Sequence, residues 1–166
     1  MRVWVSGAAG KLGTAVCQQL RAAEHEVIEA DARAGVAVDL LDPDAVAASL
    51  RGADAIVHCA AIPSPENVTP THLVENNTMS TFHALEEAWK AGIRVAVLAS
   101  SGSIYGTAWA PDLLTQPYLP VDENSALQYV DPYALTKDLL ERMGQMYARR
   151  GMTVTALRFH WIATTE

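Results

Sequence analysis

Short, continuous apolar runs alternate along this chain with longer segments of helical periodicity. In the first helical segment Leu12, Val16 and Leu20 form an i, i+4 stripe. Strands that are apolar at successive positions are buried on both faces, and strands that alternate with helices form parallel sheets. The pattern therefore predicts a doubly wound α/β fold. The expected strands are Val3–Ser6, Glu26–Ala30, Val36–Val38, Ala55–Cys59, Val95–Ser100 and Thr153–Arg158, and the expected helices are Leu12–Ala22, Pro43–Leu50, Thr71–Ala91 and Pro132–Arg150.

The composition excludes several classes of protein. A chain of 166 residues suffices for one domain, since it buries roughly 68–70% of its unfolded surface. The net charge of −7 argues against binding to nucleic acid or to anionic membranes, which requires basic patches. We expect no membrane span and no signal peptide, and we interpret Cys17 and Cys59 as small buried residues rather than a disulfide. These features predict a cytoplasmic protein.

Three glycines follow the first expected strand and open the first expected helix. Gly7, Gly10 and Gly13 have the spacing GxxGxxG. Glycines let backbone N–H groups approach a pyrophosphate, whose charge is favoured at a helix N-terminus. The alternative is a plain strand–helix turn, but the strand–loop–helix context favours a dinucleotide. We therefore expect Gly7, Gly10, Lys11, Leu12 and Gly13 to bind a dinucleotide cofactor.

Acidic residues follow the second and third expected strands. Asp31 lies 18 residues beyond Gly13, and an acid about 20 residues after such a loop binds the ribose hydroxyls. A carboxylate there repels a 2′-phosphate, which favours NAD over NADP. Arg33 could instead bind that phosphate or be a solvated loop cation. Asp39, followed by Leu40, could accept from the adenine amine or begin the next helix, and we expect both residues at the cofactor.

Tyr133 and Lys137 are four residues apart, so they share one face of an expected helix. An ammonium group favours the phenolate form of a tyrosine, and a phenolate can take a proton from an alcohol. An ordinary surface pair is the alternative interpretation. The upstream glycine loop favours hydride chemistry on a carbonyl or alcohol. Asp131 is expected to cap this helix, with Pro132 at its first position.

In this order the motifs resemble the extended short-chain dehydrogenase/reductase family, which includes sugar-nucleotide epimerases, dehydratases and uronate dehydrogenases. The resemblance extends from Met1 to about Ile162. It implies a Rossmann-like sheet with strand order 3-2-1-4-5-6 and NAD as the cofactor. Besides the glycine loop and Tyr133–Lys137, the segments that carry it are His58-Cys59-Ala60-Ala61, Asn77-Thr-Met-Ser80-Thr81 with Ser80 in place of glycine, Ser100–Gly106, and Arg158-Phe159-His160 with His160 in place of the usual asparagine.

The resemblance implies roles for particular residues. Tyr133 would be the general acid/base, and Lys137 would lower its pKa and hold the nicotinamide ribose. Ser101 would hydrogen-bond the reacting oxygen, with Ser103 as the competing candidate. Asn77 would fix the helix of the active site or relay a proton through water. Further cofactor contacts are expected from Ala60, Ala61, Asn77, Tyr133, Lys137 and His160.

Members of the family usually continue into a smaller C-terminal domain that closes over the substrate. Residues 1–166 are therefore interpreted as the dinucleotide-binding domain, with the substrate-binding part absent or not included. The interpretation is an NAD-dependent oxidoreductase acting on a sugar-like alcohol or carbonyl. The alternatives are a sugar or sugar-nucleotide epimerase with transient hydride transfer and a non-catalytic NAD(P)-binding sensor or interaction module.

Three further expectations concern features outside the core motifs. The histidines lack metal-ligand spacing, so no metal site is expected. Apolar residues on more than one side of the helices near 71–91 and 132–150 predict a homodimer. The long irregular segment 106–130 is expected to be functional, with Trp109, Tyr118 and Leu119 facing the substrate or pinning the loop.

Overall fold

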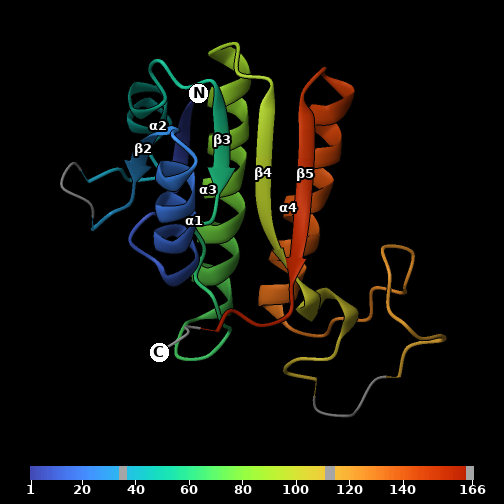
Figure 1. Cartoon of the computed structure of the whole chain (residues 1–166). Helices are drawn as coiled ribbons and strands as arrows, with labels where there is room; N and C mark the ends of the chain where they lie inside the picture. Colours follow the sequence, from blue (N-terminus) through green and yellow to red (C-terminus); the bar gives the residue numbers. More distant parts are fainter. Residues whose placement is uncertain (34–36, 111–114, 164–166) are drawn as a thin grey trace.

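The computed structural model describes residues 1–33, 37–110 and 115–163. Within these residues, parallel strands form one five-stranded sheet with the order β2-β1-β3-β4-β5 (Figure 1). The elements are β1 (Arg2–Ser6), α1 (Lys11–Ala22), β2 (Glu26–Ala30), α2 (Pro43–Ser49), β3 (Ala55–His58), α3 (Pro70–Lys90), β4 (Val95–Ser101), the short 3-10 helix η1 (Gly102–Tyr105), α4 (Pro132–Arg149) and β5 (Thr153–Phe159).

The helices cover both faces of the sheet, as a doubly wound fold requires. Helices α2, α3 and α4 pack in a row against one face, and α1 packs against β1 and β2 on the other (Figure 1). Residues of β1 show the division, because side chains alternate along a strand. Trp4 joins the cluster on the α3 side, whereas Val3 and Val5 pack with Cys17 of α1.

The predicted strand Val36–Val38 is not a strand of the described sheet. Val36 lies outside the described residues, and Ala37 makes an isolated parallel bridge with Asp31. The Asp31 side chain accepts a hydrogen bond from the N–H of Arg33, a pattern typical of a turn, so the chain turns immediately after β2. The other five predicted strands have the predicted relative order, since 3-2-1-4-5-6 without its third strand becomes 2-1-4-5-6.

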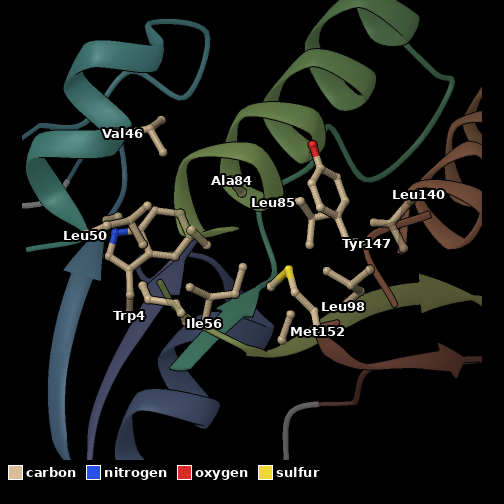
Figure 2. Packing of buried hydrophobic residues seen from close by; sticks show 14 of the residues in the cluster. Trp4, Val46, Leu50, Ile56, Ala84, Leu85, Leu98, Leu140, Tyr147 and Met152 are labelled. Atoms are coloured by element: carbon tan, nitrogen blue, oxygen red, sulfur yellow. The ribbon is translucent and has the colours of Figure 1, made fainter. Parts of the chain in front are cut away.

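The larger core lies between the sheet and the row of three helices (Figure 2). Trp4 and Ile56 of the sheet meet Leu50 at the end of α2, and the indole N–H of Trp4 donates to Ser49 Oγ at 3.0 Å. Fully burying a side chain of this kind stabilises a fold by about 1.5–3 kcal/mol. Tyr147 fills the space between α3 and α4 (Figure 2). This packing holds α4 rigidly against β4.

Helix α4 begins where the sequence predicts. Asp131 has extended backbone and its Oδ1 accepts from the N–H of Ala134 at 2.8 Å, while Pro132 occupies the first helical position. The cap satisfies one of the unpaired N–H groups at the helix start. Tyr133 therefore lies in the first turn of α4, beside the carboxyl end of β4.

Candidate active site

A cavity of about 590 Å³ opens beyond the carboxyl ends of the strands. In open α/β sheets ligands bind at this edge, where the strand order changes direction. The cavity brings together seven of the residues predicted for the cofactor. Its lining includes Gly7, Gly10, Asp31, Asp39, Leu40, Ala60 and Ala61, together with Ala32, Arg33, Ala37, Val38, Leu41, Cys59, Ile62, Asn76 and Ser80.

The glycine loop is shaped by two very close approaches of the backbone. A Cβ atom on Gly7 would lie 2.8 Å from the Cα atom of Ala60, and one on Gly13 would lie 2.1 Å from the carbonyl oxygen of Gly7. Gly7 also has φ +65°, which favours glycine. Gly10 precedes α1 without a side-chain cap. The N–H groups of the first turn, which contains Lys11 and Leu12, are thus suited to hold a pyrophosphate.

Asp31 lies buried at the end of β2, in the cavity wall. Its Oδ2 accepts from the N–H of Ala9 at 3.1 Å, and its Oδ1 accepts from the N–H of Arg33 at 2.9 Å. Burial acts to raise the pKa of Asp31, but the hydrogen bonds from Arg33 and Ala9 outweigh burial and hold that pKa below its ordinary value. The carboxylate is therefore ionised and oriented. The Arg33 side chain is 71% exposed, with its Nε atom 3.4 Å from Asp31 Oδ1.

The second predicted acid, Asp39, lines the cavity without capping a helix. Asp42 caps α2, because its Oδ1 accepts from the N–H groups of Asp44 and Ala45. Asp39 Oδ1 accepts from the N–H of Leu41 at 2.9 Å. The helix-entry alternative thus belongs to Asp42 rather than to Asp39.

Tyr133 and Lys137 are both buried on the face of α4 that contacts β4. Lys137 Nζ donates to the carbonyl oxygen of Ala99 at 2.7 Å and lies 5.6 Å from the centre of the Tyr133 ring. Burial lowers the pKa of Lys137 to about 8. Burial raises the pKa of Tyr133, and hydrogen bonding with Ser101 opposes that rise. The pKa of Tyr133 therefore lies above its ordinary value, and the predicted lowering by Lys137 does not occur in this arrangement.

Two serines lie where β4 passes into η1. Ser101 Oγ accepts from the N–H of Ser103 at 3.1 Å, and Ser101 caps η1. Ser103 Oγ is buried and has no hydrogen-bond partner among the described residues. A buried hydroxyl ordinarily has a partner, so Ser103 also remains a candidate for substrate contact.

Asn77 is buried on α3 and links three segments. Its Oδ1 accepts from Ile62 N at 2.8 Å and from Asn76 Nδ2 at 3.2 Å. Its Nδ2 donates to Ile62 O at 3.1 Å and to Thr136 Oγ1 at 3.2 Å. These four bonds use the amide's full capacity. The geometry therefore favours the interpretation in which Asn77 fixes the helix over the one in which it contacts the cofactor directly.

The remaining predicted residues lie beside the serine-rich segment or in the long loop. His160 packs over η1, because a Cβ atom on Gly102 would lie 2.5 Å from its Nδ1, and its ring stacks on that of Tyr105. Trp109 meets the ring of Tyr133 edge-on, with 5.4 Å between ring centres. Tyr118 donates to Asp122 within the loop, whereas Leu119 is 81% exposed. Trp109 thus covers the tyrosine and Tyr118 pins the loop.

Two residues of the site were not predicted from the sequence. They are Thr136, and also His58 in its role as a hydrogen-bonding group. Thr136 lies directly before Lys137, and its Oγ1 donates to the carbonyl oxygen of Tyr133 at 2.7 Å. A hydroxyl residue inside an apolar helix face was the available signal.

Within the described ranges, no cluster of three His, Cys, Asp or Glu side chains could hold a metal ion. No helix among those residues is long and apolar enough to cross a membrane.

The fold and the cavity define a dinucleotide-binding protein of Rossmann type. Residues 3–162 match the NAD dependent epimerase/dehydratase family, and the chain belongs to that family. The family predicted from the sequence is thus confirmed, and so is NAD as the cofactor of its members.

Named relatives include both dehydrogenases and epimerases. L-arabinose 1-dehydrogenase (NAD(P)(+)) of Haloferax volcanii is 30% identical over 99% of this chain and 68% of its own. UDP-glucose 4-epimerase of Azospirillum brasilense is 30% identical over 99% of this chain and 50% of its own. The predicted class of enzyme, an NAD-dependent dehydrogenase or epimerase, therefore agrees with the names of these relatives.

Solved structures agree with this assignment. A short-chain dehydrogenase/reductase superfamily protein from Agrobacterium tumefaciens with bound NAD has a TM-score of 0.84 and 31% identity, over 96% of this chain and 49% of its own. UDP-glucose-4-epimerase from Stenotrophomonas maltophila, with bound NAD and formylated UDP-arabinopyranose, has a TM-score of 0.84 and 25% identity, over 95% of this chain and 52% of its own. The chain spans about half the length of these two proteins.

Proposed function

We propose that the protein binds NAD in the cavity and transfers a hydride to or from a sugar-like alcohol or carbonyl with Ser101, Tyr133 and Lys137. One observation carries this proposal. A tyrosine and a lysine are both buried on one helix face, beside a serine and at the carboxyl end of the sheet. Burying an amine costs free energy, and buried groups with strongly shifted pKa values cluster at functional sites. Because Tyr133 would act on the substrate rather than on the cofactor, its burial beside Lys137 favours catalysis over a non-catalytic NAD(P)-binding module.

The residues of the cavity fit the cofactor. The backbone approach at Gly7 and Gly13 leaves no space for side chains, and the uncapped first turn of α1 suits a pyrophosphate. Asp31 is positioned to accept hydrogen bonds from ribose hydroxyls. A bound NAD supplies or accepts the hydride. We further propose that residues 1–166 form the dinucleotide-binding domain.

Each active-site residue then has a distinct task. In reduction the Tyr133 phenol would give its proton to the carbonyl oxygen while the carbonyl carbon receives the hydride, and in oxidation the Tyr133 phenolate would take the hydroxyl proton of the alcohol while the C–H hydride leaves for NAD. Lys137 brings a positive charge toward the tyrosine and the nicotinamide ribose. The Ser101 hydroxyl hydrogen-bonds the reacting oxygen, with Ser103 as the competing donor. Asn77 holds α4 in register.

Turnover tests the proposal directly. The protein should form NADH from NAD with at least one member of a panel of aldoses, uronic acids and UDP-sugars, and residues 1–166 assayed alone should do so slowly, because a substrate-binding part would be needed to position the substrate. Tyr133→Phe should lower the rate of that formation by about 10²–10⁴-fold and still bind NAD. NAD binding without turnover of any substrate class would contradict the catalytic proposal.

Epimerisation is the second candidate, because several relatives are UDP-glucose 4-epimerases. It uses the same residues through a transient keto intermediate. Net NADH formation separates the two, since an epimerase returns the hydride to its substrate. Product analysis of UDP-glucose incubations would show the epimer without NADH.

We also propose a homodimer through α3 and α4, which contact each other along the row (Figure 1). Large apolar side chains are exposed on both helices, although the core beneath is already filled. They are Met79 and Phe82 on α3, and Leu135 and Met146 on α4. Exposed apolar residues gathered on neighbouring helices favour burial against a second copy.

A further inference from the structure

A chain of buried hydrogen bonds runs from the end of β1 to the first turn of α4. Its members are polar side chains that are almost inaccessible to solvent. None belongs to the hydrophobic core, and His58 and Ser6 have no role in the hydride chemistry above. The members are Ser6, His58, Thr81, Asn77 and Thr136.

The direction of the first bonds follows from the backbone groups around Ser6. Ser6 Oγ accepts from the N–H of Ala60 at 3.3 Å, and it shares the N–H of Cys59, at 3.2 Å, with the Ser6 carbonyl oxygen. Its single O–H proton remains for His58 Nδ1, 2.7 Å away. His58 Nδ1 is therefore the acceptor and carries no proton.

The other ring nitrogen of His58 must then be the donor. Burial, together with the positive charge of Lys137, lowers the pKa of His58 to about 3, so its imidazole is neutral. Its Nε2 carries the remaining proton and donates to Thr81 Oγ1 at 3.1 Å. Thr81 in turn donates to the carbonyl oxygen of Asn77 at 2.8 Å. This tautomer gives every proton in the chain an acceptor.

The second half of the chain runs through the Asn77 side chain. Asn77 bonds both backbone groups of Ile62, which lines the cavity, and donates to Thr136 Oγ1. Thr136 donates to the carbonyl oxygen of Tyr133. The bonds thus connect the cavity wall at 59–62 with the turn that carries the reactive tyrosine. Ala60 also presses against Gly7, so a shift of this wall would displace the glycine loop.

We propose that His58 is a positioning residue, which as the neutral Nε2–H tautomer holds the cavity wall 59–62 and the first turn of α4 in a common register. Its hydrogen bond with Ser6 fixes the position of the wall against which the cofactor would bind. Its hydrogen bond to Thr81 fixes the position of α3 and, through Asn77, that of the turn that contains Tyr133. The inference rests on the proposed function, because the wall and the helix matter together only for a reaction between cofactor and substrate.

The tautomer can be measured without any substrate. Long-range ¹H–¹⁵N spectra of the labelled, NAD-bound protein should show His58 Nε2 protonated and Nδ1 unprotonated, with no titration between about pH 5 and pH 9. A protonated Nδ1, or a titration within that range, would overturn the proposal.

Two substitutions separate the two sides of the ring. In His58→Asn the amide oxygen can replace Nδ1 as acceptor for Ser6, but the donor to Thr81 is lost. In His58→Gln the amide nitrogen can replace Nε2 as donor, but the acceptor for Ser6 is lost. We expect His58→Gln to raise the Kd for NAD about tenfold, the scale of one unpaired buried group, and His58→Asn to lower kcat about tenfold while the Kd for NAD stays within about twofold.

Further variants distinguish positioning from a loss of stability. Thr81→Val should reproduce His58→Asn, and Thr81→Ser, which keeps the hydroxyl, should restore kcat. Tyr147→Phe removes a partly buried hydrogen bond to Glu86 far from the cavity and serves as the stability control. If both His58 variants changed NAD affinity and kcat in parallel, or matched Tyr147→Phe, the proposal would fail. The spectra and the NAD affinities require no turnover, so they test the relay even if the proposed function is wrong.

Discussion

Lys137 Nζ donates a 2.7 Å hydrogen bond to the carbonyl oxygen of Ala99, and this bond joins the second turn of α4 to the carboxyl end of β4. The lysine is almost fully buried, and the described residues place no carboxylate within ion-pairing distance of it. Burial consequently lowers its pKa from 10.5 to about 8. This shift links the stability of the protein to pH.

The contribution of Lys137 to stability should rise with pH through this window. Between about pH 8 and pH 10.5 the unfolded chain keeps a proton that folded Lys137 has released, so raising the pH favours the folded state. The gain relative to pH 7 approaches about 3 kcal/mol, since one pKa unit is worth 1.36 kcal/mol. Denaturant unfolding of the wild type and Lys137→Met from pH 7 to pH 10.5 measures the difference. An identical pH dependence in both proteins would contradict the lowered pKa.

Tyr133→Phe should lower kcat by about 10²–10⁴-fold, the usual contribution of a general acid/base. The Kd for NAD should remain within about threefold, because the phenol oxygen acts on the substrate. The hydroxyl makes no backbone hydrogen bond among the described contacts, so folding should be preserved. Calorimetry and steady-state kinetics test the two parts separately. Full turnover by this variant would remove Tyr133 from the mechanism.

Asp31 should determine the preference for NAD over NADP. In Asp31→Ser we expect the Kd for NAD to rise about tenfold, because hydrogen bonds to a charged group are lost, while the Kd for NADP does not rise. Arg33→Ala provides the matched comparison. If the Arg33 side chain is a solvated cation, this substitution should change the Kd for either cofactor very little. Wild-type binding of NADP as tight as that of NAD would instead assign the 2′-phosphate to Arg33.

Gly13→Ala should lose NAD binding and stability together. Helix propensity alone predicts a gain, since alanine is favoured over glycine by about 1 kcal/mol inside a helix. The added Cβ atom would however lie 2.1 Å from the carbonyl oxygen of Gly7, so the loop must shift. In Gly151→Ala the added atom meets nothing within 4 Å, although φ is +91°. That control should retain NAD binding, and a stable, NAD-binding Gly13→Ala protein would show that the loop yields easily.

Light scattering should give twice the mass of the chain at tens of micromolar. Phe82→Glu places a charge among the exposed apolar residues of α3 and α4 and should shift the protein to monomers. Leu119→Glu makes the same kind of change at an exposed loop position and should leave the dimer intact. A wild-type monomer at this concentration would rule out the proposed interface.

The sequence by itself determined the features that depend on neighbouring residues. Five strands and the start of α4 at Asp131 and Pro132 follow from apolar runs, helical periodicity and capping chemistry, and the relative order of the strands follows from the family resemblance of the motifs. The glycine loop was also readable, because a strand, three glycines and a helix lie in one short segment. These features depend on residues that are close together in the sequence, so they can be predicted from the sequence alone.

Only the tertiary structure decided which distant groups share a hydrogen bond. Lys137 bonds Ala99 rather than the tyrosine hydroxyl, the fully hydrogen-bonded amide of Asn77 holds α4 in place, and Ala37 makes an isolated bridge with Asp31. These outcomes depend on the depth of packing between α3, α4 and the sheet. The spacing of residues along the chain does not indicate how closely these elements pack, because the packing brings together side chains that are many tens of residues apart in the sequence.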